Sequence, residues 1–295
     1  MNLSGRTVIL TGAAGGIGSA LALELCAEGA DVLAIGRRAG ALDQLRQRCA
    51  GRPGQLHPLA ADITDAVDRQ RIVEAARSFR APSVLVHGAA CSAFGLFADS
   101  DEAERERLMQ TNVLAPMALT QLLLPLLLAQ AAPAVVAIGS TFGSLAHPGF
   151  AAYSASKFAL RGFIEALGRE HADTALAAFW IAPRATATGF NSAAVDALNA
   201  QLRTRVDSAE TAAAGILHAL KHDRHRRQLG FPEKLFAWLN GAFPALIDRG
   251  LRGALPAVRT HAAAARAAAP RIQPVVAPLI PTVPRSPARP QGATP

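Results

Sequence analysis

The sequence predicts an α/β fold in which helices cover both faces of a parallel sheet. Apolar, strand-like segments alternate with helix-like segments from the N-terminus onward, which is the pattern of successive β–α–β units. Hydrophobic residues make up 51% of the 295 residues and charged residues only 18%. A sheet that is buried on both faces needs this much apolar material.

Seven segments are predicted to be strands, because each is a short apolar run bounded by turn residues. They are residues 6–12, 31–36, 55–62, 83–88, 134–140, 175–183 and 227–230. The predicted helices lie between them, and Thr64 is expected to cap the third. They are residues 17–28, 42–49, 65–79, 101–130, 151–171 and 208–221.

Two C-terminal segments follow this alternation. Residues 232–262 have the spacing of an amphipathic helix, broken at Pro244. Residues 263–295 are basic and rich in proline and alanine, which predicts a disordered tail, with a helical stub as an alternative for the alanine run 262–269. We therefore expect a main domain of residues 1–231 that carries the active site, then the helical segment and the tail.

The net charge of +8 belongs largely to the C-terminal end of the chain. No acidic residue follows Asp248, whereas seven arginines do. No aromatic or base-reading pattern accompanies these arginines, so we expect no nucleic-acid binding.

The cysteines and the N-terminus predict a cytoplasmic protein. Cys26, Cys49 and Cys91 match no disulfide framework and no metal spacing, and are expected to be reduced thiols. No basic segment precedes a cleavable apolar stretch, so we expect no secretory signal. Residues 108–146 carry no charge and could span a membrane, but three prolines interrupt them and favour a buried helix followed by a buried strand.

A glycine-rich loop, TGAAGGIG at 11–18, follows the first strand and opens the first helix. Gly12, Gly16 and Gly18 would let the backbone turn sharply and approach a pyrophosphate, and the helix N-terminus would supply free N–H groups. A simple tight turn is the alternative. The position after the first strand favours a dinucleotide site.

The ends of the next two strands indicate which dinucleotide would bind. Arg37 and Arg38 follow the second strand, where an acidic side chain would take the adenosine ribose 2′-hydroxyl. Arginine instead favours a 2′-phosphate, and so NADP(H) over NAD(H), unless both side chains are merely solvated. Asp62, after the third strand, would contact the adenine or cap the next helix.

The catalytic candidates centre on YSASK at 153–157. Tyr153, the only tyrosine, lies four residues before Lys157, so one helix face would carry both. The ammonium would stabilise the phenolate and lower its pKa. Ser140, at the end of a strand, could polarise a substrate carbonyl. Asn112 could hold a water that links Lys157 to solvent, or could be a surface or capping residue.

In this order and spacing, the motifs resemble those of the short-chain dehydrogenase/reductase family over about residues 3–232. The matching positions are TGAAGGIG at 11–18, Asp62, Asn112, Ser140, YSASK at 153–157 and the proline of IAPRATAT at 181–188. The resemblance implies a doubly wound, Rossmann-type sheet of seven strands. It also implies a catalytic tetrad of Asn112, Ser140, Tyr153 and Lys157. A basic residue after the second strand, here Arg37, is typical of members that use NADP(H).

We expect the cofactor to contact residues from the glycine loop, the strand ends and the tetrad. These are Thr11, Gly12, Gly16, Ile17, Gly18, Arg37, Arg38, Asp62, Ala89, Tyr153, Lys157, Pro183 and Thr188.

Two positions depart from the family pattern. His87, Gly88, Ala89 and Ala90 replace the usual Asn-Asn-Ala-Gly after the fourth strand. The glycine would preserve close packing against the cofactor, and the histidine would be a hydrogen-bonded core residue. Arg184 replaces the usual glycine after Pro183, where it would reshape the pocket, meet an anionic substrate or point to solvent.

The main functional hypothesis is a carbonyl reductase or alcohol dehydrogenase acting on a small, apolar carbonyl or alcohol. The alternative, motivated by the two departures, is a cofactor-binding or regulatory protein with weak catalysis. Family members usually form dimers or tetramers, so a homo-oligomer is expected. Residues 232–262 would cover the substrate cleft, lie in a dimer interface or lie on a membrane surface.

Overall fold

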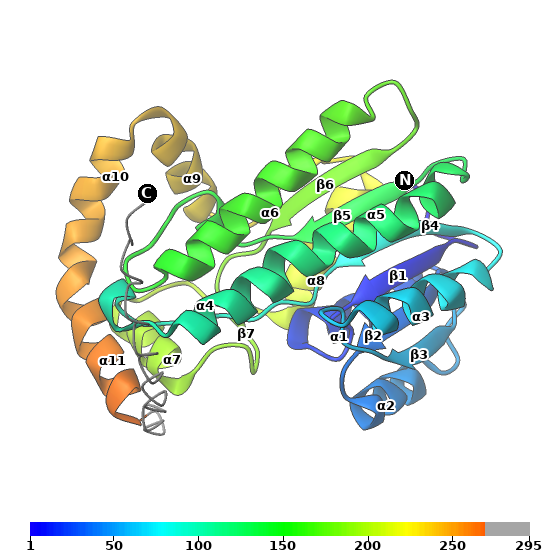
Figure 1. Cartoon of the computed structure of the whole chain (residues 1–295). Coiled ribbons are helices and arrows are strands. Elements are labelled where there is room, and N and C mark those ends of the chain that lie inside the picture. The colour runs from blue at the N-terminus through cyan, green and yellow to red at the C-terminus, as the bar shows by residue number, and fades with distance from the viewer. Residues whose placement is uncertain (269–295) are drawn as a thin grey trace, which may run out of the picture.

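A computed structural model describes residues 1–268, which fold around one parallel seven-stranded sheet (Figure 1). The strand order is β3-β2-β1-β4-β5-β6-β9. The strands are β1 Thr7–Thr11, β2 Asp31–Gly36, β3 Leu56–Ala60, β4 Pro82–His87, β5 Ala134–Ile138, β6 Ala177–Ala182 and β9 Arg226–Gln228. All seven predicted strands are therefore confirmed, and the fold is doubly wound.

The third strand contains Pro58, which cannot donate a backbone hydrogen bond. The structure places β3 at the edge of the sheet, where proline is tolerated. A second, two-stranded sheet pairs β7 (Thr186–Ala187) with β8 (Asp207–Ser208). Strands of two residues show no periodicity, so the sequence did not predict them.

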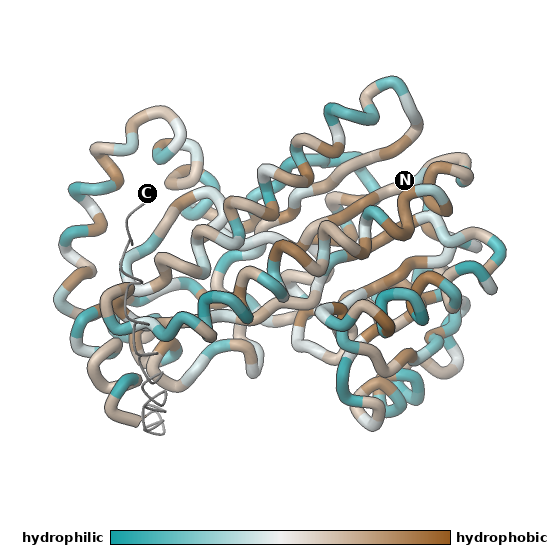
Figure 2. The backbone as a smooth tube through the Cα atoms, viewed as in Figure 1, coloured by the Kyte–Doolittle hydropathy of each residue, from teal (hydrophilic) through white to brown (hydrophobic). Residues whose placement is uncertain are grey.

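Helices cover both faces of the sheet. The apolar sides of α1 (Gly16–Ala27), α2 (Ala39–Cys49) and α8 (Ala209–Lys221) form one buried cluster with the strands. On the opposite face, α3 (Ala66–Arg77), α5 (Ala115–Leu128) and α6 (Ala151–Glu170) contribute to a second buried cluster, with α5 between the other two (Figure 1). Figure 2 shows the hydrophobic residues concentrated along the central strands and α5. The cap of α3 is Asp65, which accepts from the Asp68 N–H, so the prediction for Thr64 was wrong.

The long predicted helix at 101–130 contains a π-helical turn. It runs as α4 (Glu102–Met109), the π turn (Gln110–Leu114) and α5. Glu102–Leu128 is long and apolar enough to cross a membrane by length and composition, yet one side of α5 lies in the core against the sheet. That packing agrees with the predicted buried helix followed by a buried strand.

The C-terminal segment forms three helices instead of one. They are α9 (Glu233–Ala242), α10 (Pro244–Leu251) and α11 (Leu255–Ala268), with a break at Phe243 before Pro244 as expected. Residues 263–268 were expected in the tail but are helical, as the alternative for the alanine run allowed. The rest of the predicted tail, 269–295, lies outside the described residues.

Candidate active site

A cavity of about 1180 Å³ lies along the carboxyl ends of the parallel strands. Residues that follow β2, β1, β4, β5 and β6 line it: Arg37, Gly12, Ala89, Ser140 and Pro183. The strand order reverses between β1 and β4, which is where doubly wound sheets place their ligand crevice. The fold thus gathers residues that are more than a hundred positions apart in the sequence.

Three glycines of the loop, Gly12, Gly16 and Gly18, have no room for a side chain. Gly12 has φ +71°, and a Cβ there would lie 2.6 Å from the Ala89 nitrogen. A Cβ on Gly18 would lie 2.1 Å from the Gly12 carbonyl oxygen, and one on Gly16 would lie 2.3 Å from a Thr188 methyl carbon. The first turn of α1, which includes Ile17, lines the cavity and carries no acidic residue. These features fit the pyrophosphate of a dinucleotide.

Thr11 does not line the cavity but fixes the backbone that does. Its buried hydroxyl donates to the Val86 carbonyl at 3.2 Å and accepts from the N–H groups of Gly88 (3.1 Å) and Ala89 (3.2 Å). Thr11 therefore joins the ends of β1 and β4 across the reversal point. We expected a direct cofactor contact, and the geometry supports a positioning role.

The arginines after β2 lie on the cavity wall. Arg38 donates to the Ala14 carbonyl at 3.1 Å, whereas Arg37 makes no hydrogen bond or ion pair within residues 1–268. Asp62 also lines the cavity, and its Oδ1 accepts from the backbone N–H and the hydroxyl of Thr64. Arg37 is thus exposed at a wall of the cavity, and its guanidinium is not paired with any group of residues 1–268.

Tyr153 lies in the first turn of α6, and its side chain is almost fully buried. Burial raises the pKa of Tyr153 to about 12, and the neighbouring Ser140 hydroxyl opposes this rise. The Lys157 amine lies 5.8 Å from the centre of the tyrosine ring. The expectation that Lys157 would lower the phenol pKa is not met in the protein without cofactor, because burial dominates.

Lys157 is buried one helical turn further along α6. Its Nζ donates to the Ile138 carbonyl at 3.2 Å, and no carboxylate pairs with it among the described residues. Burial therefore lowers the pKa of Lys157 to about 8. A buried ammonium with a single carbonyl partner retains donors for a ligand in the cavity, whose wall it forms.

This burial makes the stability of the cofactor-free protein depend on pH. The pKa of Lys157 is near 8 when folded and 10.5 in the reference state, so between these values the unfolded chain holds an extra proton. The free energy of unfolding should therefore rise with pH in this window. Lys157→Met should remove that rise and be more stable than the original protein below pH 8, by on the order of 3 kcal/mol at most.

Urea unfolding at pH 7, 9 and 10 measures this difference. Lys234→Met is the matched control, because Lys234 is exposed. For this control, the free energy of unfolding should vary with pH as it does in the unmodified protein. The same pH dependence in Lys157→Met would contradict the lowered pKa of Lys157.

Asn112 lies in the π turn, and its side chain bonds to protein groups. Its amide N–H groups reach the Cys91 carbonyl (2.9 Å) and the Ser156 hydroxyl (3.0 Å), and its oxygen accepts from the Cys91 N–H (2.9 Å). The side chain therefore ties the segment after β4 to α6, and the water link to Lys157 stays a prediction. Pro116 has no N–H for the Asn112 carbonyl four residues earlier, which leaves that oxygen without its α-helical donor.

The departure at 87–90 is accommodated by the core. A Cβ on Gly88 would lie 2.7 Å from the Thr11 carbonyl oxygen, so glycine preserves the close approach of β1 and β4. His87 is buried, and its Nε2 lies 2.8 Å from the Thr120 hydroxyl. Its Nδ1 has no hydrogen-bond partner among the described residues. Only one of the two ring nitrogens of this core histidine is therefore hydrogen-bonded, where we expected a fully hydrogen-bonded side chain. Burial lowers the pKa of His87 to about 3, which keeps the ring neutral near pH 7.

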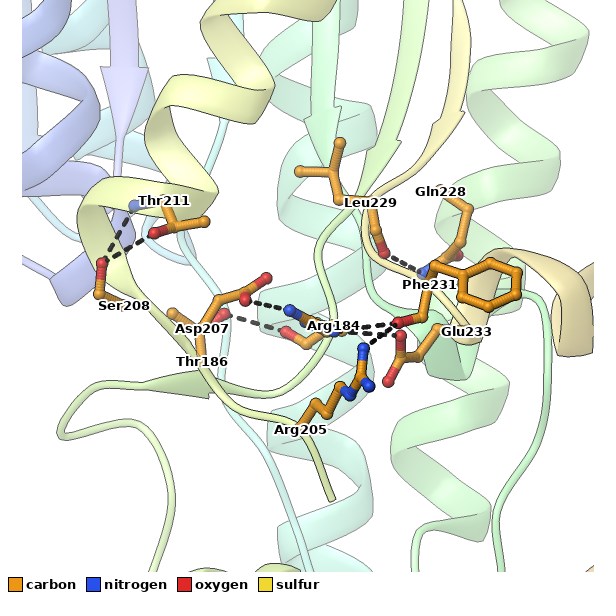
Figure 3. A network of polar contacts seen from close by, with 10 residues as sticks. All are labelled: Arg184, Thr186, Arg205, Asp207, Ser208, Thr211, Gln228, Leu229, Phe231 and Glu233. Atoms are coloured by element: carbon orange, nitrogen blue, oxygen red, sulfur yellow. Dashed lines mark hydrogen bonds and ion pairs between the residues drawn. The ribbon is translucent and has the colours of Figure 1, made fainter. Parts of the chain in front are cut away.

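Arg184 is neutralised by acidic side chains (Figure 3). Its guanidinium lies 2.5 Å from the Asp207 carboxylate and 3.6 Å from that of Glu233, and it also donates to the Phe231 carbonyl. The network ties the segment after β6 to β8 and to the start of α9. Arg184 therefore lines the cavity with its charge compensated, which argues against one of the three alternatives, contact with an anionic substrate.

Aromatic side chains surround the phenol on the substrate side. The rings of Phe142, Phe150 and Phe190 have centres 6.2–6.4 Å from that of Tyr153, and His147 stacks on Phe142 at 5.4 Å. Burial lowers the pKa of His147, which favours the neutral form of the ring. No sequence motif marks these aromatic residues, so the sequence does not predict them as part of the site, although all of them line the cavity.

Two further helices complete this side of the cavity: α7 (Ala193–Gln201), which the sequence did not predict, and α11, which falls in the predicted C-terminal helical segment and the alanine run. Val195 and Leu198 of α7 line the cavity, and Val258 of α11 is buried in the same cluster as Tyr153. Gly149 lacks the Cβ that would lie 2.8 Å from Val258. The C-terminal helix α11 therefore packs behind this wall of the cavity.

Known proteins are similar to this chain in sequence and in fold. A family model described as short chain dehydrogenase matches residues 6–199, well over half of the chain. The chain belongs to the short-chain dehydrogenase family. This confirms the resemblance based on the motifs, and establishes an oxidoreductase of the nicotinamide-dependent short-chain type.

Individual relatives of this short-chain dehydrogenase differ in length and ligand. A glycine betaine reductase of Emericella nidulans is 32% identical over 232 residues, which cover 76% of this chain but 18% of that enzyme. A Burkholderia phymatum short chain dehydrogenase/reductase in complex with NAD has a TM-score of 0.75 and 20% identity, with 83% of this chain and 96% of that chain covered. A Sphingobium yanoikuyae short-chain dehydrogenase in complex with NADPH has a TM-score of 0.70 and 24% identity, with 82% and 95% covered.

Proposed function

We propose that this short-chain dehydrogenase uses NADP(H) to interconvert an uncharged, apolar carbonyl compound and its alcohol. The observation that carries the proposal is the meeting of Tyr153, Ser140 and Lys157 in one cavity with the glycine loop. The cavity is large enough for a dinucleotide beside a small substrate, and its glycine cradle fits a pyrophosphate. When bound, the nicotinamide supplies or accepts the hydride.

The chain's own residues would move and hold the proton. A phenol with a raised pKa is protonated at neutral pH, so Tyr153 donates its proton to the carbonyl oxygen during reduction. The Ser140 hydroxyl donates a hydrogen bond to the same oxygen and orients it. Lys157 presents its remaining N–H groups to the ribose, and Asn112 and Thr11 fix the surrounding backbone.

The guanidinium of Arg37 lines the cavity and has no hydrogen bond or ion pair within residues 1–268, which supports a preference for the 2′-phosphate of NADP(H). Arg37→Asp should lower kcat/KM with NADPH by about 10–100-fold, because a charge-assisted hydrogen bond worth about 1.5–3 kcal/mol is lost and a like charge is added. Activity with NADH should be retained or increased.

Steady-state kinetics with both cofactors measure the change. The matched control is Arg46→Asp, an exposed arginine on α2 that does not line the cavity. Equal losses with NADPH and NADH in the Arg37 variant would argue against recognition of the phosphate.

The substrate side supports an apolar substrate, because aromatic rings surround the phenol and Arg184 is neutralised. Purified protein should be assayed with NADPH against acetophenone, 2-butanone and the anionic 2-oxobutanoate. We expect the highest kcat/KM for acetophenone and the lowest for the anion. If no ketone or alcohol reacts while cofactor binds, the alternative of a weakly catalytic cofactor-binding or regulatory protein is favoured.

An apolar surface on α4, the π turn, α5 and α6 supports a homo-oligomer. Met109, Leu114, Met117 and Phe158 are all at least 36% exposed on these elements. Light scattering should report a dimer or tetramer, and a Leu114→Glu/Phe158→Glu double variant should dissociate it.

A further inference from the structure

Six large apolar side chains are exposed within a short stretch of the C-terminal arm. The arm consists of α9, α10 and α11, which lie along one side of the molecule in Figure 1. The exposed residues, which we name the α9–α10 face, are Phe231, Leu235, Phe236, Trp238, Phe243 and Leu246. Trp238 is 63% exposed and Phe231 64%. Large apolar side chains that gather in this way mark a surface with a partner.

These two helices bury very little of their own hydrophobic surface. No residue of α9 is buried, and in α10 only Ile247 is. An amphipathic helix of a globular protein normally turns its apolar stripe to the core. With 10 and 8 residues, α9 and α10 are also far shorter than the ~20 residues needed to cross a bilayer. Their composition therefore suits helices that lie on a surface.

The charge around this face selects the kind of surface. Lys234, Arg249 and Arg252 are exposed on α9, on α10 and just after it, against one exposed acid, Asp248. The other acid of the segment, Glu233, is paired with Arg184. Two copies of such a face would bring like charges together, whereas anionic lipid headgroups would attract them. Tryptophan is also enriched where apolar and polar phases meet.

We propose that the α9–α10 face docks onto a bilayer that contains anionic phospholipid. The aromatic and leucine side chains enter the headgroup boundary, and the flanking cations bind lipid phosphates. This binding is independent of the proposed cofactor preference and substrate.

The structure connects this face to the active site. Glu233, the first residue of α9, lines the cavity and pairs with Arg184 (Figure 3). Asn240, near the end of α9, donates to the Ser144 carbonyl at 3.0 Å, in the segment between Ser140 and Tyr153. Docking would therefore hold the cavity near the lipid surface, where apolar substrates concentrate.

Vesicle co-sedimentation of the full chain tests the proposal, with vesicles of phosphatidylcholine alone or with 30% phosphatidylserine. The intact protein should partition at least tenfold more into the anionic vesicles. A Phe236→Ser/Trp238→Ser double variant should lose at least tenfold of this binding. Val67→Ser is the control: Val67 is 69% exposed but lies on α3, so its variant should bind like the intact protein.

Tryptophan fluorescence gives an independent readout. The chain has two tryptophans, and Trp180 is already buried, so a blue shift on adding anionic vesicles reports Trp238. Circular dichroism melts verify that the double variant is folded. Equal vesicle binding by the double variant, or absence of vesicle binding by the intact chain, overturns the proposal. Self-association that the double variant abolishes, without vesicle binding, would assign the face to a second copy instead.

Discussion

Replacing Tyr153 by phenylalanine is expected to lower kcat for ketone reduction by about 10²–10⁴-fold. Tyr153 is the only tyrosine in the chain, and its side chain is buried at the cavity that Ser140 and Lys157 also line. The variant keeps the ring that contacts Phe142, Phe150 and Phe190, so the fold and the cofactor site should persist. Single-turnover rates and NADPH fluorescence titrations measure the two effects separately.

The control for this variant is Ser144→Ala. It removes a hydroxyl from the segment that follows Ser140, at a residue that does not line the cavity. Its kcat should stay within a few-fold of the unmodified enzyme. A Tyr153→Phe enzyme that retained full activity with NADPH would remove the proposed mechanism, whereas loss of NADPH binding would indicate a structural role for the phenol.

The raised pKa of Tyr153 also predicts how the two directions depend on pH. With a pKa near 12 in the free enzyme, the phenol is protonated throughout the range from pH 6 to 9. The kcat/KM for ketone reduction should therefore show no loss from Tyr153 in this range. Alcohol oxidation needs the phenolate, so its kcat/KM should increase with pH.

The second large effect is expected for Gly18→Ala. The new Cβ would lie 2.1 Å from the Gly12 carbonyl oxygen and 3.1 Å from the Ala13 Cα, which are backbone atoms that cannot move away alone. Displacement of the loop should destabilise the fold by about 1–3 kcal/mol and weaken dinucleotide binding more than tenfold. Urea unfolding and NADPH titration measure the two losses.

Gly162→Ala makes the matched control, because its Cβ would meet nothing within 4 Å on α6. Alanine has the higher helix propensity, so this variant should be more stable by about 0.5–1 kcal/mol and bind cofactor normally. If Gly18→Ala bound NADPH as tightly as this control, the close approach of the loop would not be required for binding.

Much of the fold could be predicted because parallel strands that are buried on both faces are continuous apolar runs. Even β9, with only Arg226–Gln228 in the strand, was detected close to its position. Helix α7 was not predicted because it is short and buries only Val195 and Leu198, which leaves little apolar periodicity to detect. The cap of α3 was assigned one residue early, because Thr64 and Asp65 are both good caps and only the backbone selects between them.

The site divides in the same way between local and distant contacts. Tyr153 and Lys157 could be paired from the sequence since one helical turn joins them. Thr11 could be named but not given its role, because its partners lie on β4, 75–78 residues away. Arg184 could be flagged as unusual, but its orientation depends on Asp207 and Glu233, which no local pattern connects to it.

The sequence by itself determined the order of strands and helices, the glycine loop and the tyrosine–lysine pair, because each depends on neighbours within a few residues. Only the tertiary structure decided how these groups meet. In the folded protein, the Asn112 side chain bonds to Ser156, and burial raises the pKa of Tyr153. The Arg184 guanidinium forms ion pairs with two carboxylates. Burial and long-range pairing set these properties, and both arise from elements that come together only when the sheet forms.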